Sequence, residues 1–149
     1  MFEVRGDMAG GCSVLKDAYK TTVFALSRWR NRAKPDGVLG PDGPVMPDRV
    51  IVKPPSAELR PGQKDEDSLP PYSLLDRILE GLVDKEMSVK EVALAAGADI
   101  ALVAEIETKL LRAEYKRRQA PPGVKIGSRN FGRDRRYPIT NFFHTGPRK

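Results

Sequence analysis

Proline and glycine restrict this chain more than any other feature, because thirteen of each occur among its 149 residues. Proline removes a backbone N–H donor and fixes φ, and glycine raises the entropic cost of ordering the backbone. Both residues recur throughout 35–47, and the polar stretch 60–71 ends in two consecutive prolines. We therefore predict long loops over 35–47 and 60–71, with regular structure confined to the segments outside them.

Apolar residues spaced three or four positions apart predict that most of the remaining segments are helical. The helices are expected at about 17–33, 72–83, 88–97 and 99–118. A short extended piece is expected at 49–53, and the basic stretch 123–149 is expected to be irregular. With so few strands, these residues alone do not build a self-contained α/β sheet.

Polar and small residues mark the ends of the predicted helices. Asp17 and Asp99 are expected to cap the helices that follow them, since a side-chain oxygen at that position accepts a free backbone N–H. Ser88 and Glu91 have the spacing of a capping box. Gly97 suits the left-handed conformation that often ends a helix.

The formal net charge is +6, and all of the excess lies in the last quarter of the chain. From residue 112 onward there are eleven Lys and Arg against two acids, whereas residues 1–111 carry more acids than bases. This asymmetry indicates a polyanionic partner, whether nucleic acid, a membrane surface or a phosphorylated ligand.

Two basic clusters make up most of this charge. One is Lys116-Arg117-Arg118, and the other comprises arginines at 129, 133, 135 and 136. A solvated helix end explains the first cluster taken alone, because cations favour the last turn of a helix. Two such clusters around aromatic residues suit contacts with phosphates and rings together.

The helix pair predicted over 88–118 resembles a helix-turn-helix, and the basic tail beside it fits DNA binding. A recognition helix needs side chains that hydrogen-bond to base edges and tolerate phosphate. Its positions here include Asp99, Leu102 and Glu105, which are apolar or acidic. We therefore interpret the pair as two packed helices.

Several classes of protein are excluded by composition. Cys12 is the single cysteine and His144 the single histidine, so an internal disulfide framework and a Cys/His metal cage are both excluded. No apolar run approaches the roughly 20 residues of a membrane-spanning helix. The N-terminus lacks the layout of a signal peptide, so a cytoplasmic protein is expected.

Several ordered strings together resemble the glutamine-dependent NAD+ synthetases, in the C-terminal half of their synthetase domain. The strings include Gly6-Asp7-Met8-Ala9-Gly10-Gly11, Pro54-Pro55-Ser56-Ala57-Glu58-Leu59, Glu114-Tyr115-Lys116-Arg117-Arg118-Gln119-Ala120-Pro121-Pro122 and Phe131-Gly132-Arg133-Asp134-Arg135-Arg136-Tyr137-Pro138. We assign residues 1–142 to this incomplete domain and 143–149 to a divergent tail.

The resemblance implies a fold and an activity. The fold is a doubly wound α/β domain of the adenine-nucleotide hydrolase-like, ATP-pyrophosphatase type, of which this part is mostly helical with long loops. The activity is that of a ligase that makes NAD+ from deamido-NAD+, using ATP and Mg²⁺ and passing through an adenylated intermediate. An amidase domain supplies ammonia from glutamine, and family members are often homo-oligomers.

The same resemblance implies roles for five residues. Lys20 and Ser56 match positions that contact the phosphates of ATP. Tyr115 and Lys116 match the pair that meets deamido-NAD+, and Asp7 lies in a loop facing its nicotinate ribosyl part.

Three parts of the family pattern are missing from these 149 residues. They are the Ser-Gly-Gly-x-Asp-Ser phosphate loop, the acid that holds Mg²⁺, and the amidase domain. We therefore expect no metal ligand and no catalysis from this chain alone. Three explanations for the missing parts stay open: they lie on another chain, they are lost from the gene, or a misplaced start codon excludes them. No membrane or nucleic-acid partner is expected from the resemblance. The alternative is a non-catalytic nucleotide- or nucleic-acid-binding protein that uses the basic C-terminal segment.

Overall fold

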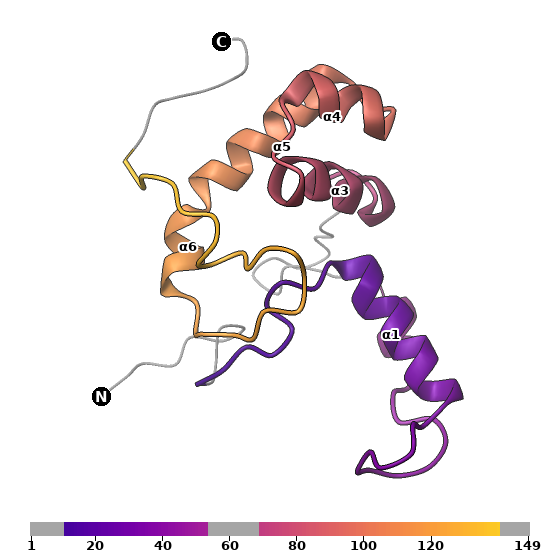
Figure 1. The fold of residues 1–149 in the computed structure, drawn as a ribbon. Coiled ribbons are helices and arrows are strands. Elements are labelled where there is room, and N and C mark those ends of the chain that lie inside the picture. The colour runs from indigo at the N-terminus through magenta and orange to yellow at the C-terminus, as the bar shows by residue number, and fades with distance from the viewer. Residues whose placement is uncertain (1–10, 54–68, 141–149) are drawn as a thin grey trace, which may run out of the picture. The chain divides into compact units, whose positions relative to one another are not determined.

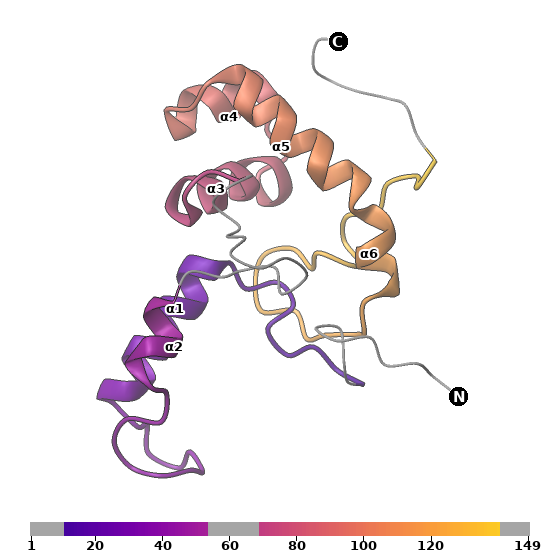
Figure 2. The same cartoon turned by 180° about the vertical axis from the view of Figure 1, so that it is seen from behind.

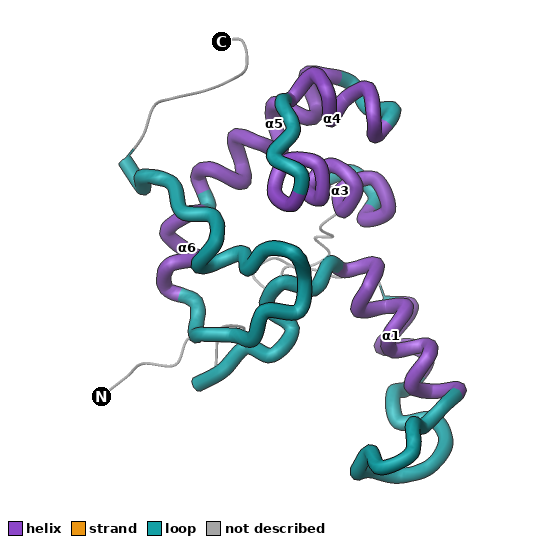
Figure 3. The backbone as a smooth tube through the Cα atoms, viewed as in Figure 1, coloured by secondary structure: helices purple, strands orange, loops and turns teal. Residues whose placement is uncertain are grey.

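The structure is a computed structural model that describes residues 11–53 and 69–140. Within these ranges the chain forms helices joined by long loops and contains no strand (Figure 3). It divides into two compact units, which we call the α1 unit (Tyr19–Asp76) and the α5 unit (Met1–Ala18 with Arg77–Lys149). The mostly helical character predicted for this part of the domain is confirmed.

In the α1 unit, helix α1 (Lys20–Arg32) lies beside the short helix α2 (Asp48–Val52) (Figure 2). The first turn of α3 (Tyr72–Leu79) also belongs to this unit. The ring of Phe24 meets that of Tyr72 edge to face, with 6.3 Å between the centroids. Ile51 of α2 is buried, whereas no residue of α1 is.

Helix α1 begins at Lys20, so the prediction that Asp17 caps it is wrong. Tyr19 occupies the N-cap position and its side chain accepts no hydrogen bond there. Instead, the amide of Thr21 donates to the Asp76 carboxylate at 2.8 Å. The carboxylate that satisfies this free N–H therefore comes from α3, 55 residues away along the chain.

The segment predicted to be extended forms helix α2 instead. Pro47 precedes the helix and Asp48 lies in its first turn, and both are start signals for a helix. The β-branched run of Val50, Ile51 and Val52 favours a strand locally, yet the segment is helical and buries Ile51.

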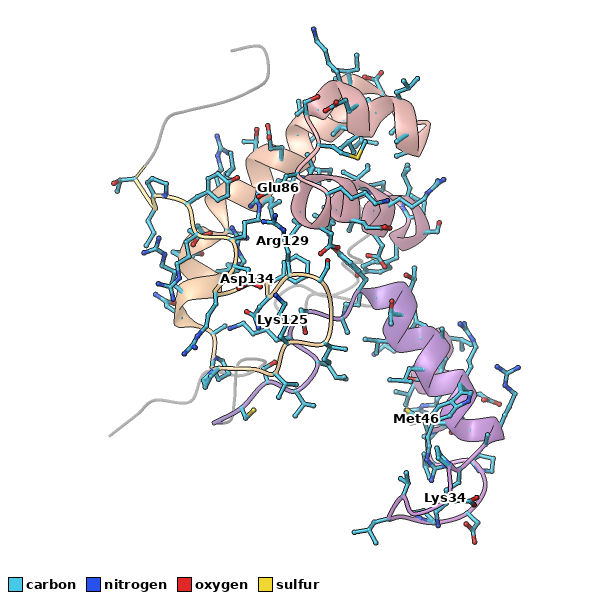
Figure 4. All side chains as sticks on the ribbon, viewed as in Figure 1. Lys34, Met46, Glu86, Lys125, Arg129 and Asp134 are labelled. Atoms are coloured by element: carbon cyan, nitrogen blue, oxygen red, sulfur yellow. The ribbon has the colours of Figure 1, made fainter. Side chains whose placement is uncertain are left out.

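The loop predicted over 35–47 is confirmed, and α1 holds its far end (Figure 4). The Asn31 side chain donates to the Met46 carbonyl at 2.7 Å and accepts the amides of Val45 and Met46 at 3.0 Å. One amide side chain therefore replaces three hydrogen bonds that a regular element would supply.

The α5 unit contains the rest of α3, a π-helical turn (Glu80–Asp84), α4 (Val89–Ala96), α5 (Ile100–Arg112) and α6 (Glu114–Gln119). Helices α4 and α5 pack side by side (Figure 1). The core is apolar and consists of Ile78, Leu82, Val83, Val89, Val92, Ala93, Ala96, Val103 and Ile106.

The predicted helix ends in this unit are confirmed. Ser88 and Glu91 form a complete capping box. Gly97 ends α4 with φ of 63°, and the Asp99 carboxylate accepts the amide of Ala101 at 2.6 Å. The single helix predicted over 99–118 is interrupted at Ala113, which separates α5 from α6.

None of the described helices is long and apolar enough to cross a bilayer.

Candidate anion-binding site

The two ends of the described chain meet in the α5 unit, where residues 11–18 lie against the loop that follows α6 (Figure 1). The amide of Ser13 donates to the Pro122 carbonyl at 2.8 Å, and Lys16 Nζ donates to the Pro121 carbonyl at 2.9 Å. A Cβ on Gly123 would collide with the Ser13 carbonyl oxygen. Glycine is therefore required for this close approach of two backbones.

The buried side chain of Asp17 also holds residues 11–18 against the loop that follows α6. Its Oδ2 accepts the amides of Ile126 at 2.9 Å and Gly127 at 3.1 Å, and the residue is only 5% exposed. Burial opposes ionisation of this carboxyl, but the two backbone hydrogen bonds keep the pKa of Asp17 below its ordinary value.

A tight turn at residues 130–134 presents the basic side chains of the loop. Asn130 Oδ1 accepts the amides of Gly132 at 2.9 Å and Arg133 at 3.1 Å. The carboxylate of Asp134 accepts the amide of Asn130 at 2.9 Å and the ammonium of Lys125 at 2.8 Å (Figure 4). These hydrogen bonds hold the backbone of Arg133 in place, and its side chain takes part in none of them.

The loop is also fixed to the π-helical turn and the residues after it. Arg129 pairs with Glu86 at 2.6 Å (Figure 4), and the Ser128 hydroxyl donates to Asp84 at 2.9 Å. Arg129 is therefore occupied by a carboxylate and is less available to a ligand than the other arginines of its cluster.

Glu114 organises the other wall of the site, which is α6. Its carboxylate is 1% exposed and accepts Arg117 at 2.7 Å and Arg118 at 3.1 Å. Burial opposes ionisation, but the two guanidinium groups outweigh it and lower the pKa of Glu114. Arg118 also donates to the Tyr137 carbonyl at 2.9 Å, which joins α6 to the loop.

These contacts border an open cavity of about 500 Å³, and most of the polar side chains that line it are cationic. Among residues 11–53 and 69–140, its polar lining consists of Lys16, Arg117, Arg118, Asn130, Arg133 and Arg136, none of which is a carboxylate. We call this cavity the basic pocket. Its size and charge suit an anion that carries several negative oxygens.

Arg135 lies behind this surface and is only 8% exposed. Its guanidinium carbon is 4.3 Å from the centroid of the Tyr137 ring, a cation–π contact. Its Nη1 has no hydrogen-bond partner within the described part of the chain. Burial lowers the pKa of Arg135, and repulsion from Arg117 lowers it further.

Of the residues implied by the family resemblance, Lys20, Tyr115 and Lys116 do not line the basic pocket. Lys20 is the first residue of α1 and is exposed in the α1 unit. Tyr115 and Lys116 are exposed neighbours on α6, in the α5 unit. Asp7 and Ser56 lie outside the described residues.

The two basic clusters predicted from the sequence do meet in the pocket. Arg117 and Arg118 come from one cluster, and Arg133 and Arg136 from the other. Sequence reasoning missed Lys16 and Asn130 as functional candidates. Lys16 gives no local signal, because only its contact with residues more than 100 positions away brings it to the pocket.

The described ranges 11–53 and 69–140 contain no group of three His, Cys, Asp or Glu side chains arranged to hold a metal ion. Cys12 is a free, exposed thiol. The acids described above already accept hydrogen bonds from backbone amides, from basic side chains or, at Asp84, from the Ser128 hydroxyl. These residues therefore do not fit a Mg²⁺ site.

Comparison with known proteins gives a consistent result. A family profile described as NAD synthase matches residues 2–120. The chain is 51% identical over 138 residues to a glutamine-dependent NAD(+) synthetase of Rhodobacter capsulatus, covering 93% of this chain and 25% of that protein. It is 49% identical over 136 residues to the protein of that name from Acinetobacter baylyi, covering 91% of this chain and 24% of the relative.

The solved structures that match include that of glutamine-dependent NAD+ synthetase from Acinetobacter baumannii in complex with adenosine diphosphate. The TM-score is 0.49 at 38% identity, with 95% of this chain and 23% of that chain covered. The chain spans about a quarter of the length of the curated relatives that it matches.

Proposed function

Because the chain belongs to the NAD synthase family, we propose that it forms part of a ligase that amidates deamido-NAD+ to NAD+ at the expense of ATP. The observation that carries this proposal is the 51% identity, over 93% of the chain, to a protein named glutamine-dependent NAD(+) synthetase. The basic pocket and the exposed cations of α6 suit substrates that are both polyanions.

The proposed reaction has two steps. A carboxylate oxygen of the nicotinate attacks the α-phosphorus of ATP, and pyrophosphate leaves. Ammonia, released from glutamine elsewhere in the enzyme, then attacks the adenylated carbonyl carbon, loses a proton and displaces AMP. The first step brings a carboxylate up to the phosphates of ATP, and the second builds negative charge on the carbonyl oxygen and on the departing AMP. Cationic side chains that hold the phosphates therefore favour both steps.

We assign Lys116 and Tyr115 to the dinucleotide. Glu114 precedes them but is fully engaged by Arg117 and Arg118, so it does not compete for the ammonium of Lys116. The Lys116 side chain forms no hydrogen bond or ion pair with the described part of the chain and is exposed. Tyr115 is 44% exposed and offers a ring face and a hydroxyl beside it.

We assign Lys20 to a phosphate of ATP. It occupies the first position of α1, where the helix dipole adds to its own positive charge. The assignments of Ser56 to the ATP phosphates and of Asp7 to the nicotinate ribosyl part rest on the sequence resemblance.

We propose that residues 1–142 belong to a doubly wound domain and that 143–149 diverge from it. The phosphate loop, the Mg²⁺ ligands and the amidase are supplied by another part of the enzyme, in a cytoplasmic and homo-oligomeric assembly. These residues alone are then inactive.

A chimera tests the function directly. Residues 2–120 of this chain replace the matching segment of the Rhodobacter capsulatus relative, and NAD+ formation is followed with ATP, Mg²⁺, deamido-NAD+ and ammonia. We expect activity, and a loss of about tenfold or more with Lys116→Ala because a phosphate or carboxylate contact is removed.

Lys90→Ala in the same chimera is the matched control, since Lys90 is an exposed lysine of α4. It should leave the rate unchanged. A folded chimera that forms no NAD+, or one that is equally active with and without Lys116, contradicts the proposal. NAD+ formation by the 149 residues alone contradicts the proposed incompleteness.

A further inference from the structure

The basic pocket has more positive charge than its described hydrogen bonds and ion pairs neutralise. Of its five cations, three are tied to the protein: Lys16 to the Pro121 carbonyl, and Arg117 and Arg118 to Glu114. These three side chains build the wall. They leave a net positive surface, because one carboxylate is shared by two guanidinium groups.

The other two cations, Arg133 and Arg136, have no such structural role. Both are exposed, and neither side chain forms a hydrogen bond or ion pair with the residues that the structure describes. Their backbone is held in place by the turn at residues 130–134. Two guanidinium groups are thus presented at one cavity without a partner.

Unsatisfied N–H groups lie in the wall of the pocket, on Arg117, and behind it, on Arg135. Arg117 Nε and Arg135 Nη1 are buried N–H groups that find no hydrogen-bond partner among the residues that the structure describes. Arg117 also lies close enough to Arg135 to repel its charge. Positive charge concentrated in this way is stabilised by an anion nearby.

The shape of the pocket also favours a compact anion. A Cβ on Gly132 would lie 2.8 Å from Lys16 Nζ, so glycine keeps the ammonium close to the backbone of the turn. A guanidinium binds two phosphate oxygens at once, and two unpaired arginines match two adjacent phosphates.

We propose that the basic pocket binds the diphosphate group of a nucleotide, at a site separate from Tyr115 and Lys116. The natural source of this diphosphate, a dinucleotide or ATP, rests on the proposed function. That the pocket binds a diphosphate is argued from its own side chains and does not depend on the proposed function.

Isothermal titration of the 149-residue chain with inorganic pyrophosphate tests the site. We expect saturable 1:1 binding that weakens about tenfold or more in each of Arg133→Gln and Arg136→Gln, as the loss of a charge-assisted contact predicts. Arg112→Gln is the matched control, because Arg112 is an exposed arginine of the same unit that does not line the pocket. It should bind as the unmodified chain does, and circular dichroism should show all three variants folded.

Two further titrations distinguish the sources of the diphosphate. ADP-ribose carries a bridging diphosphate as dinucleotides do, and ATP carries a terminal one. Arginine-dependent binding of ADP-ribose in preference to ATP assigns the pocket to the dinucleotide, and the reverse assigns it to ATP.

Two results would overturn the proposal. One is pyrophosphate binding that is absent or is equally weakened by Arg112→Gln. The other is binding of duplex DNA that is steeply salt-dependent and stronger than that of pyrophosphate, which would make the patch a nucleic-acid surface. Because pyrophosphate contains no nicotinate, the pocket stands if Lys116 proves unimportant in the chimera, and the proposed function stands if pyrophosphate does not bind.

Discussion

Glu114 is a buried acid in a stretch of chain that is otherwise basic. It binds Arg117 and Arg118 together and so sets the position of the helical wall of the basic pocket. Removing one partner from a buried ion pair leaves the other charge uncompensated, which costs about 3–5 kcal/mol. The residue is therefore a positioning group for the pocket.

The pH dependence of stability tests this role. The pKa of Glu114 is lower in the folded chain than its ordinary value of 4.5. The unfolded chain consequently binds the proton more readily, so the stabilisation is complete above about pH 4.5 and disappears as pH falls through the folded pKa. We expect Glu114→Gln to lower the free energy of unfolding by about 3 kcal/mol at pH 7 and by progressively less below pH 4.5.

Urea unfolding of both proteins from pH 7 to pH 3 measures this difference. Glu105→Gln is the control, because Glu105 forms an exposed pair with Lys109 and should change little at any pH. A Glu114→Gln effect that is constant across this range would show that the charge of the carboxylate is unimportant.

Residues whose partners are close in sequence could be predicted. Ser88, Glu91, Gly97 and Asp99 were assigned correctly, because helix caps depend on neighbours within a few positions. Asp17 has the same local character but binds amides 109 and 110 residues away. Sequence pattern carries no information about such a partner.

The π-helical turn and α4 meet at Gly81. A Cβ at this position would lie 2.8 Å from Cγ2 of Val92, closer than packed carbon atoms approach. Valine is stiff because two heavy atoms branch from its Cβ, so it does not swing aside easily. Glycine therefore sets the distance between these two elements.

A double-mutant cycle tests this packing. We expect Gly81→Ala to lower the free energy of unfolding by about 1–3 kcal/mol through overpacking. We expect Val92→Ala to be destabilising alone and to relieve part of the Gly81→Ala effect, giving a favourable coupling energy. Additive effects in denaturant unfolding would contradict a direct contact.

Elements were predicted well where the apolar repeat is long and poorly where it is short. The repeats of α3, α4 and α5 extend over two or more turns, and these helices are found. Helix α2 has five residues, and its β-branched run gave the wrong prediction. The turn at Ala113 has no sequence signal that separates α5 from α6.

At the scale of the whole molecule, side chains of both basic clusters counted in the sequence meet at the basic pocket. The family resemblance predicted from ordered sequence strings is confirmed. The roles implied for Lys20, Ser56, Tyr115, Lys116 and Asp7 remain predictions. The basic pocket itself required the fold, because its lining comes from segments before α1 and after α5.

The proposed function requires above all that this chain recognises the dinucleotide through α6. The direct measurement is isothermal titration of the 149-residue chain with deamido-NAD+, in parallel for Lys116→Ala and Lys90→Ala. We predict saturable binding that is weakened about tenfold or more by Lys116→Ala alone. No saturable binding, or equal binding by all three proteins, would contradict it.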